Sequence, residues 1–254
     1  MAPAAPVGAV GTVPDLWMAT MSSSYHRLAF TSDVLGIQEQ YGSRRALDRL
    51  DRLHPQLKAR DPGPAPRDAL TADERGFLGE LDGFYLASVS STGWPYVQFR
   101  GGPPGFIRTL DEHTIAWADF RGNRQYISVG NVASERRVAL IFLDYARQLR
   151  LKVFGTARVE DAPTASSAEE RSALGLEGYR AKVEREVRVD VTAYDWNCPQ
   201  HIVPRYTVEE LASVVDPLRR RLSDLERENA RLRRVVERAD EATEAAGAGP
   251  VGRA

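Results

Sequence analysis

Two polar, glycine-rich stretches of the chain carry residue types that could hold an anionic ligand. The first reads QFRGGPPGF at 98–106, and the second reads ADFRGNRQYISVGN at 118–131. Within them, Arg100, Arg121 and Arg124 supply guanidinium groups, whose planar donors suit phosphate oxygens. These residues predict a phosphate-binding site on strand ends and the loops beside them.

The backbone of the same stretches favours close approach of a ligand. Gly101, Gly102 and Gly122 have no side chain to keep a ligand away. A helix expected over 125–133 would present its first N–H groups to an anion. The alternative is that the glycines only serve turns and the arginines are solvated; for Arg100 and Arg124 we favour a ligand. Neither stretch matches a phosphate loop or a dinucleotide fingerprint.

Cys198 and His201 are the two residues that resemble a nucleophile and its base. Their i, i+3 spacing could form a thiolate–imidazole couple if a turn brings them together. The alternative is an inert buried cysteine and a structural histidine. The other histidines, at 26, 54 and 113, show no ligand spacing, so no metal site is expected.

Composition excludes several classes of protein. The 254 residues include 34 Lys and Arg against 35 Asp and Glu, a formal net charge of -1, which argues against a globally basic nucleic-acid binder. No apolar run approaches the roughly 18 residues of a membrane span. The Pro- and Ala-rich start lacks the features of an export signal, and with a single cysteine we expect a cytoplasmic protein.

The middle of the chain has the pattern of short antiparallel strands. Three hairpin patterns and a strictly alternating final segment predict an α+β, mainly β, fold: a six-stranded antiparallel barrel with flanking helices at about 122–135 and 167–184. The strand segments are 84–90, 94–100, 106–110, 114–119, 138–144, 149–159 and 187–194.

The rest of the chain divides around this barrel. Residues 32–58 have helical spacing with a break near Gly42, and Thr71 with Glu74 forms a capping box. We therefore expect five parts. They are a disordered leader (1–21), a helical segment with its linker (22–68), the barrel (69–206), C-terminal helices (207–239) and a disordered tail (240–254).

A heptad repeat marks the C-terminal helices. Thr207 with Glu210 caps a short helix, and Asp216-Pro217 is typical of a second helix start. The repeat predicts a parallel two-stranded coiled coil in a homodimer, through Leu218, Leu222, Leu225, Asn229 and Leu232. The alternative is one amphipathic helix folded back on the barrel. Residues 217–238 hold eight arginines and four acidic residues, but the acidic entry and Pro217 argue against nucleic-acid binding.

Longer motifs resemble a known family. FYLASVSSTGWPYVQFRGGPPGF, DFRGNRQYISVGN and LRLKVFGTARV resemble the pyridoxamine 5'-phosphate oxidase-like, FMN-binding split-barrel family, and the resemblance extends over about 25–206. It implies a homodimeric split barrel with FMN at the subunit interface. The residues it implies for cofactor binding are Gln98, Arg100, Gly101, Ala118, Asp119, Phe120, Asn123, Arg124, Gln125, Arg150 and Trp196.

The chain departs from the B6-oxidising members of that family. Pro103 stands in place of their lysine, and 195–201 reads DWNCPQH where they carry an Arg-x-His motif. We therefore expect an FMN-dependent oxidoreductase for an unidentified small molecule, with oxidation of vitamin B6 itself not expected. Two alternatives stay open: a split barrel that uses F420 or haem, and a flavin-binding sensor or carrier without turnover.

Overall fold

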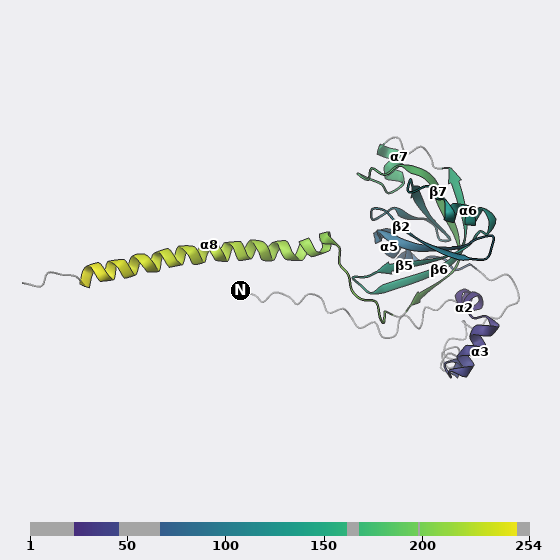
Figure 1. The fold of residues 1–254 in the computed structure, drawn as a ribbon, viewed down its shortest axis with the longest axis horizontal. Helices are drawn as coiled ribbons and strands as arrows, with labels where there is room; N and C mark the ends of the chain where they lie inside the picture. The colour runs from purple at the N-terminus through teal and green to yellow at the C-terminus, as the bar shows by residue number, and fades with distance from the viewer. Residues whose placement is uncertain (1–22, 46–66, 162–167, 198, 248–254) are drawn as a thin grey trace, which may run out of the picture. The chain divides into compact units, whose positions relative to one another are not determined.

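The computed structural model describes residues 23–45, 67–161, 168–197 and 199–247. Contacts divide the chain into two compact units, Met1–Val203 and Pro204–Ala254. The first unit contains the β-sheet and the second contains one long helix (Figure 1). The expected leader, most of the expected linker and residues 248–254 of the expected tail lie outside the described residues. Residues 240–247, also expected to be disordered, belong to the long helix.

A seven-stranded antiparallel sheet forms the first unit. Its strand order is β2-β1-β5-β6-β7-β4-β3. The antiparallel α+β fold is confirmed, and each of the seven predicted strand segments forms a strand of the sheet, so the expected total of six strands was one too low. The strands are β1 Gly83–Val89, β2 Pro95–Gly101, β3 Ile107–Asp111, β4 Thr114–Phe120, β5 Arg137–Asp144, β6 Leu149–Asp161 and β7 Val183–Asn197.

Alternation along the strands builds the core. In β1, Phe84 and Leu86 are buried, and the residues between them are less so. The Phe84 ring lies 4.9 Å from Trp117 on β4 and 5.0 Å from Phe142 on β5, between ring centroids. Because β4 and β5 are not neighbours in the strand order, this contact requires the sheet to curl around its inner face.

Helix α5, Ala72–Glu80, begins at the predicted capping box. Glu74 accepts a hydrogen bond from the backbone N–H of Thr71 at 2.8 Å, and the Thr71 hydroxyl caps the helix in return. Phe77 and Leu78 are buried and anchor the helix to the core. The cap therefore fixes where this helix starts and which face it buries.

Two helical predictions within the barrel are wrong in extent. Helix α6 is Ile127–Ser134, and α7 is only Ala168–Ala173. The expected helix over 167–184 is shorter because Val183 already belongs to β7 and continues its alternation. Strand β7 pairs with both β4 and β6, and these hydrogen bonds stabilise the strand conformation relative to a helix.

In the described residues before α5 there are two short helices. Helices α2, Ser23–Ala29, and α3, Ser32–Gln40, lie within the expected helical segment. Gly42 follows α3 with a φ of 75°, a left-handed conformation that ends the helix near the predicted break. The ring of Tyr25 stacks on Phe154 of β6 at 5.0 Å, so α2 packs against the outer face of the sheet.

The second unit contains α8, a single 40-residue helix over Val208–Gly247. The Thr207–Glu210 capping box is confirmed by hydrogen bonds in both directions, 2.7 and 3.1 Å long. The expected break at Pro217 is wrong, and the helix runs beyond 239. Proline removes only one N–H donor from this helix, too little to end a segment with helix-favouring residues on both sides. No helix in the described residues is apolar over a length that would cross a membrane.

Candidate functional site

A buried carboxylate joins two strands that are far apart in the sheet order. Arg100 at the end of β2 donates from Nη1 to Oδ1 of Asp119 at the end of β4, at 2.6 Å. Arg185 on β7 donates from Nε to the other oxygen, Oδ2, at 3.0 Å. Asp119 is 3% exposed, and each of its two oxygens accepts from a guanidinium group. Arg185 also pairs with Glu184 at 3.0 Å, so in this cluster the two arginines are balanced by two carboxylates.

Helix α6 is hydrogen-bonded to β1 and β2. The hydroxyl of Ser128 donates to Oε1 of Gln98 on β2 at 2.8 Å. One turn later, Asn131 donates to the Ser88 hydroxyl of β1 at 3.0 Å, in the buried core. The N-terminus of α6 makes no side-chain cap hydrogen bond at Tyr126. Its first backbone N–H groups are therefore free to bind an anion.

The loop before α6 has an unusual backbone. Arg124 and Tyr126 have positive φ angles of 63° and 52°. Left-handed conformations cost non-glycine residues about 1–2 kcal/mol each, and they persist where surrounding contacts enforce them. Here Arg124 donates from Nε to the Tyr126 hydroxyl at 3.2 Å, and the guanidinium of Arg185 lies 4.6 Å from the centre of the Tyr126 ring. The loop thus places Arg124 beside the cluster.

One donor in this cluster has no partner. Nε of Arg100 is buried and makes no hydrogen bond within the described part of the chain. An unpaired buried donor costs about 1–3 kcal/mol, which a bound acceptor would recover. The uncapped start of α6 and the exposed guanidinium of Arg124 are further donors of the kind that phosphate groups bind.

Protein packing accounts for two of the predicted glycines. A Cβ on Gly101 would lie 2.9 Å from the Phe99 ring, and one on Gly102 would lie 2.5 Å from the Phe106 ring. Gly122 is different, because a Cβ there would meet nothing within 4 Å. Only Gly122 therefore faces open space, where a ligand could approach.

The other predicted residues of β4 and its loop lie beside the cluster. Ala118 is buried, and the half-buried Phe120 ring lies 5.2 Å from Tyr179. Asn123 accepts the backbone N–H of Gln125 at 3.1 Å, so it shapes the loop, and the Gln125 side chain is exposed.

Arg150 and Trp196 lie on β6 and β7. The Trp196 indole donates to Oε1 of Glu74 at 2.7 Å, and its ring lies 4.8 Å from Phe77. This tryptophan is therefore fixed against α5 in its own chain. Arg150 lies two residues before Lys152 on the outer face of β6; burial, helped by the charge of Arg150, lowers the pKa of Lys152.

The suggested thiol–imidazole pair is untested. Cys198 lies outside the described residues, and His201 is exposed with a φ of 66°. Within the described residues, no three His, Cys, Asp or Glu side chains gather as metal ligands would.

Asp195 is a second buried carboxylate, which sequence reasoning did not single out. It is 4% exposed, and its Oδ1 has no hydrogen-bond partner among the described residues. It lies opposite Lys152 in the β6–β7 register. Burial raises the pKa of Asp195 to about 6, although the charge of Lys152 opposes the shift.

This shift predicts how stability depends on pH. The folded chain holds the Asp195 proton up to about pH 6, whereas the unfolded chain loses it near pH 4, so stability falls as the pH rises between these values. We expect Asp195→Asn to remove this fall and to gain about 2 kcal/mol on the wild type between pH 4 and pH 7. Urea unfolding at several pH values measures it; parallel pH profiles of the two proteins would contradict the assignment.

Sequence reasoning missed Arg185, Tyr126 and Ser128. A signal for Arg185 exists: the alternation of VEREVRV places it on the same strand face as Val187 and directly opposite Asp119 in the β4–β7 register. The roles of Tyr126 and Ser128 depend on the loop conformation, which no spacing rule gives.

Of two sequence comparisons with known proteins, one identifies a family. The family model for pyridoxamine 5'-phosphate oxidase matches residues 70–194. A search of curated proteins found no match.

The solved structures that resemble the chain share little sequence with it. HupZ of Group A Streptococcus is 17% identical, over 54% of this chain and 99% of its own, with a TM-score of 0.39. An F420 reductase is 20% identical, over 48% and 94%, with a TM-score of 0.35. HutZ, the haem storage protein of Vibrio cholerae, is 13% identical, over 50% and 93%, with a TM-score of 0.35.

Proposed function

The chain belongs, through residues 70–194, to the pyridoxamine 5'-phosphate oxidase-like split-barrel family, and on this basis we propose that it is an FMN-dependent oxidoreductase acting on a small molecule. The observation that carries the proposal is the donor set around Arg100: a buried unpaired Nε, an uncapped helix N-terminus and a loop that holds Arg124 beside them. A phosphate monoester is the part of FMN that such donors bind best.

The proposed phosphate contacts are made by residues of one chain. Arg100, Arg124 and the first N–H groups of α6 hold the phosphate. Gln98, with its amide oxygen engaged by Ser128, keeps its NH₂ group to donate to a polar edge of the cofactor. When bound, FMN supplies the hydride or electron transfer, and the protein orients the ring and controls its access to water.

A second copy of the chain fits the same proposal. The outer face of β1 and β2 exposes apolar side chains, with Val97 61% and Phe99 56% exposed. Trp94, in the turn between these strands, is 76% exposed. Exposed large apolar side chains on neighbouring residues favour an interface, so we assign this edge of the sheet to a homodimer contact between barrels. In this dimer we assign Arg150 to the isoalloxazine edge, and Trp196, held in place by Glu74 and Phe77, to a contact near the flavin of the other subunit.

Release of cofactor from the purified protein tests the proposal. We expect a yellow protein whose denatured supernatant contains FMN in about equimolar amount, and whose flavin is bleached by NADH or NADPH. Bound flavin that no nicotinamide cofactor reduces would favour the sensor or carrier. A colourless protein that binds no added FMN would overturn FMN as the cofactor, and titration with F420 and haem would then identify the alternative.

A further inference from the structure

The heptad surface of α8 has no role in the proposed cofactor site. Its d positions are Leu211, Leu218, Leu225 and Leu232, and its a positions are Val215, Leu222, Asn229 and Val236. Within the second unit these side chains lie open: Leu218 is 64% exposed, Leu222 58% and Leu232 52%. A continuous apolar stripe on a 40-residue helix requires a partner surface of matching period.

We propose that this stripe pairs with the same stripe of a second copy, as a parallel two-stranded coiled coil. The first argument is charge complementarity beside the stripe. Arg221 at a g position would face the partner's Glu226 at an e position, and Glu228 would face the partner's Arg233. Both pairs are attractive in parallel register, and the twofold axis repeats each of them.

The opposite orientation is disfavoured by the same charges. In an antiparallel coil that sets Leu222 against the partner's Leu232, Glu226 would lie beside the partner's Glu226, and Glu228 beside the partner's Glu228. Like charges in these positions repel and cost stability. The charge pattern therefore selects the parallel arrangement.

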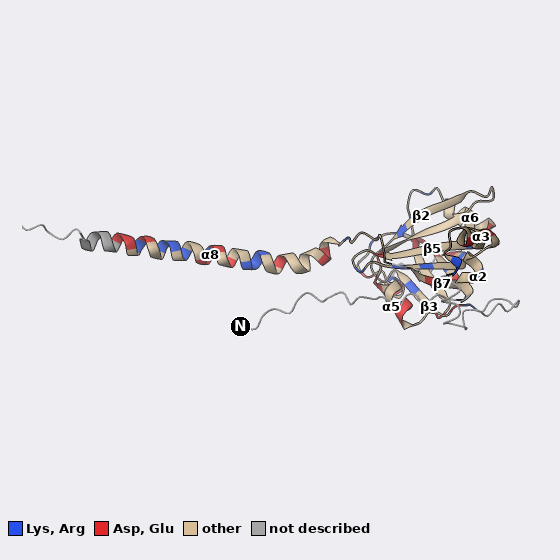
Figure 2. Ribbon diagram, turned by 90° about the horizontal axis from the view of Figure 1, so that it is seen from below, with Lys and Arg blue, Asp and Glu red and all other residues tan. Residues whose placement is uncertain are grey.

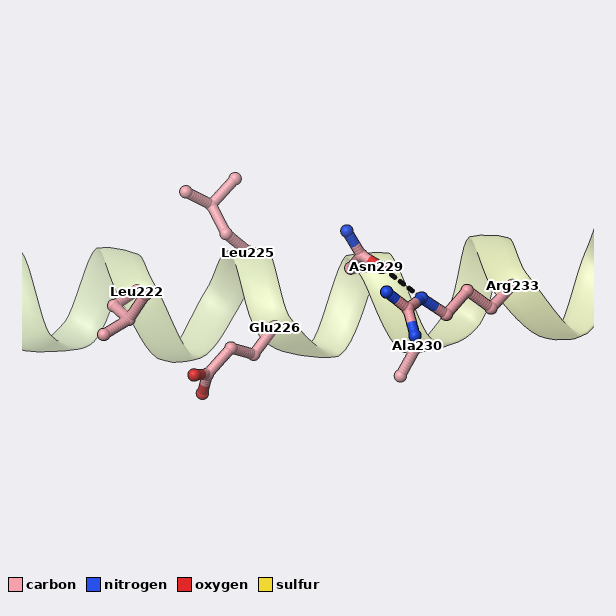
Figure 3. A pocket seen from close by; sticks show the side chains of 6 residues that line it. All are labelled: Leu222, Leu225, Glu226, Asn229, Ala230 and Arg233. Atoms are coloured by element: carbon pink, nitrogen blue, oxygen red, sulfur yellow. Dashed lines mark hydrogen bonds between the residues drawn. The ribbon is translucent and has the colours of Figure 1, made fainter.

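Asn229 is the second argument. It is the one polar residue among the four a positions, and in the single helix its Oδ1 accepts a hydrogen bond from Nε of Arg233 at 2.8 Å (Figure 3). A lone asparagine at an a position of a parallel dimer pairs with its counterpart and fixes the register. Arg233 would then be released to reach the partner's Glu228.

The faces of the helix away from the stripe carry charged side chains, which favour contact with solvent. Acidic and basic residues alternate along α8 (Figure 2), and Arg227 pairs with Asp224 on the face away from the stripe. Arg231, also on an outer face, pairs in the single helix with Glu228 beside the stripe at 3.9 Å. The stripe is thus the one apolar face of a helix that is otherwise charged, which matches a coil and not a helix buried on all sides.

Cysteine cross-linking on the full chain tests the proposal. Cys198→Ser first removes the native thiol, and Leu222→Cys then places a thiol at an a position; Ser223→Cys, one residue further on an outer face, is the matched control. Disulfides need Cα atoms within about 7 Å, which a parallel register gives at 222 but not at 223. Under mild oxidation we expect Leu222→Cys to form covalent dimer about tenfold faster than the control.

Every result of the cross-linking experiment either supports or contradicts the parallel coiled coil. Equal rates would show chance collisions between unpaired helices and overturn the proposal. No cross-link from Leu222→Cys, or from Leu225→Cys at the next d position, would overturn it too, since an antiparallel coil would set Leu222 against the partner's Leu232. Because the readout is on α8 alone, it is independent of whether the barrel binds FMN.

Discussion

The double variant Arg100→Ala with Arg124→Ala is expected to lose FMN on purification. Each guanidinium contributes charge-assisted hydrogen bonds of about 1.5–3 kcal/mol to a bound phosphate, so losing both should weaken FMN binding by about 100-fold or more. Fluorescence titration of apoprotein with FMN measures this change. Arg137→Ala, which removes an exposed arginine paired only with nearby Glu135, should leave the affinity unchanged.

The single variants separate binding from folding. Arg124 is fully exposed and forms no buried ion pair, so Arg124→Ala should reduce FMN affinity about tenfold without changing the unfolding curve. Arg100 also neutralises Asp119, so Arg100→Ala should reduce both affinity and stability. Full FMN occupancy in the double variant would contradict the assignment of the phosphate site.

Much of this site was predictable because it depends on strand alternation. Gln98 and Arg100 face inward since they lie opposite Leu86 and Phe84, and alternation alone places them there. Asp119 is two residues beyond Trp117 on the same face of β4. The hydrophobic pattern thus brought three of the predicted residues to one end of the barrel.

The rest depends on conformations that patterns do not encode. Arg124 reaches the cluster through a left-handed backbone at two non-glycine positions, 124 and 126, where standard turn rules expect glycine or asparagine. Pro217 shows the opposite error: a local rule predicted a break, and a long helix with favourable residues on both sides continued through it. In both cases the whole structure overrides a local preference.

Removing the carboxylate that joins the strands should cause the largest loss of stability. Asp119→Ala leaves Arg100 without its counter-charge and Arg185 with Glu184 alone, at 16% and 19% side-chain exposure for the two arginines. Breaking a buried ion pair from one side costs about 3–5 kcal/mol, and since these cations keep some solvent we expect about 3 kcal/mol. Urea unfolding measures this loss. The control is Glu160→Ala, which removes partly exposed pairs with Arg158 and Arg188 and should cost less than about 1 kcal/mol.

The same variant distinguishes a structural carboxylate from a ligand contact. Asp119 is negative, so it opposes a bound phosphate directly and assists only by holding Arg100 and Arg185 in place. In Asp119→Ala molecules that remain folded, the net charge of the cluster rises by one, and we expect FMN to bind at least as tightly as to the wild type. A loss of affinity without a loss of stability would show instead that Asp119 contacts the cofactor itself. Equal unfolding free energies for Asp119→Ala and Glu160→Ala would show that the ion pairs of Asp119 do not join β2 to β4 and β7.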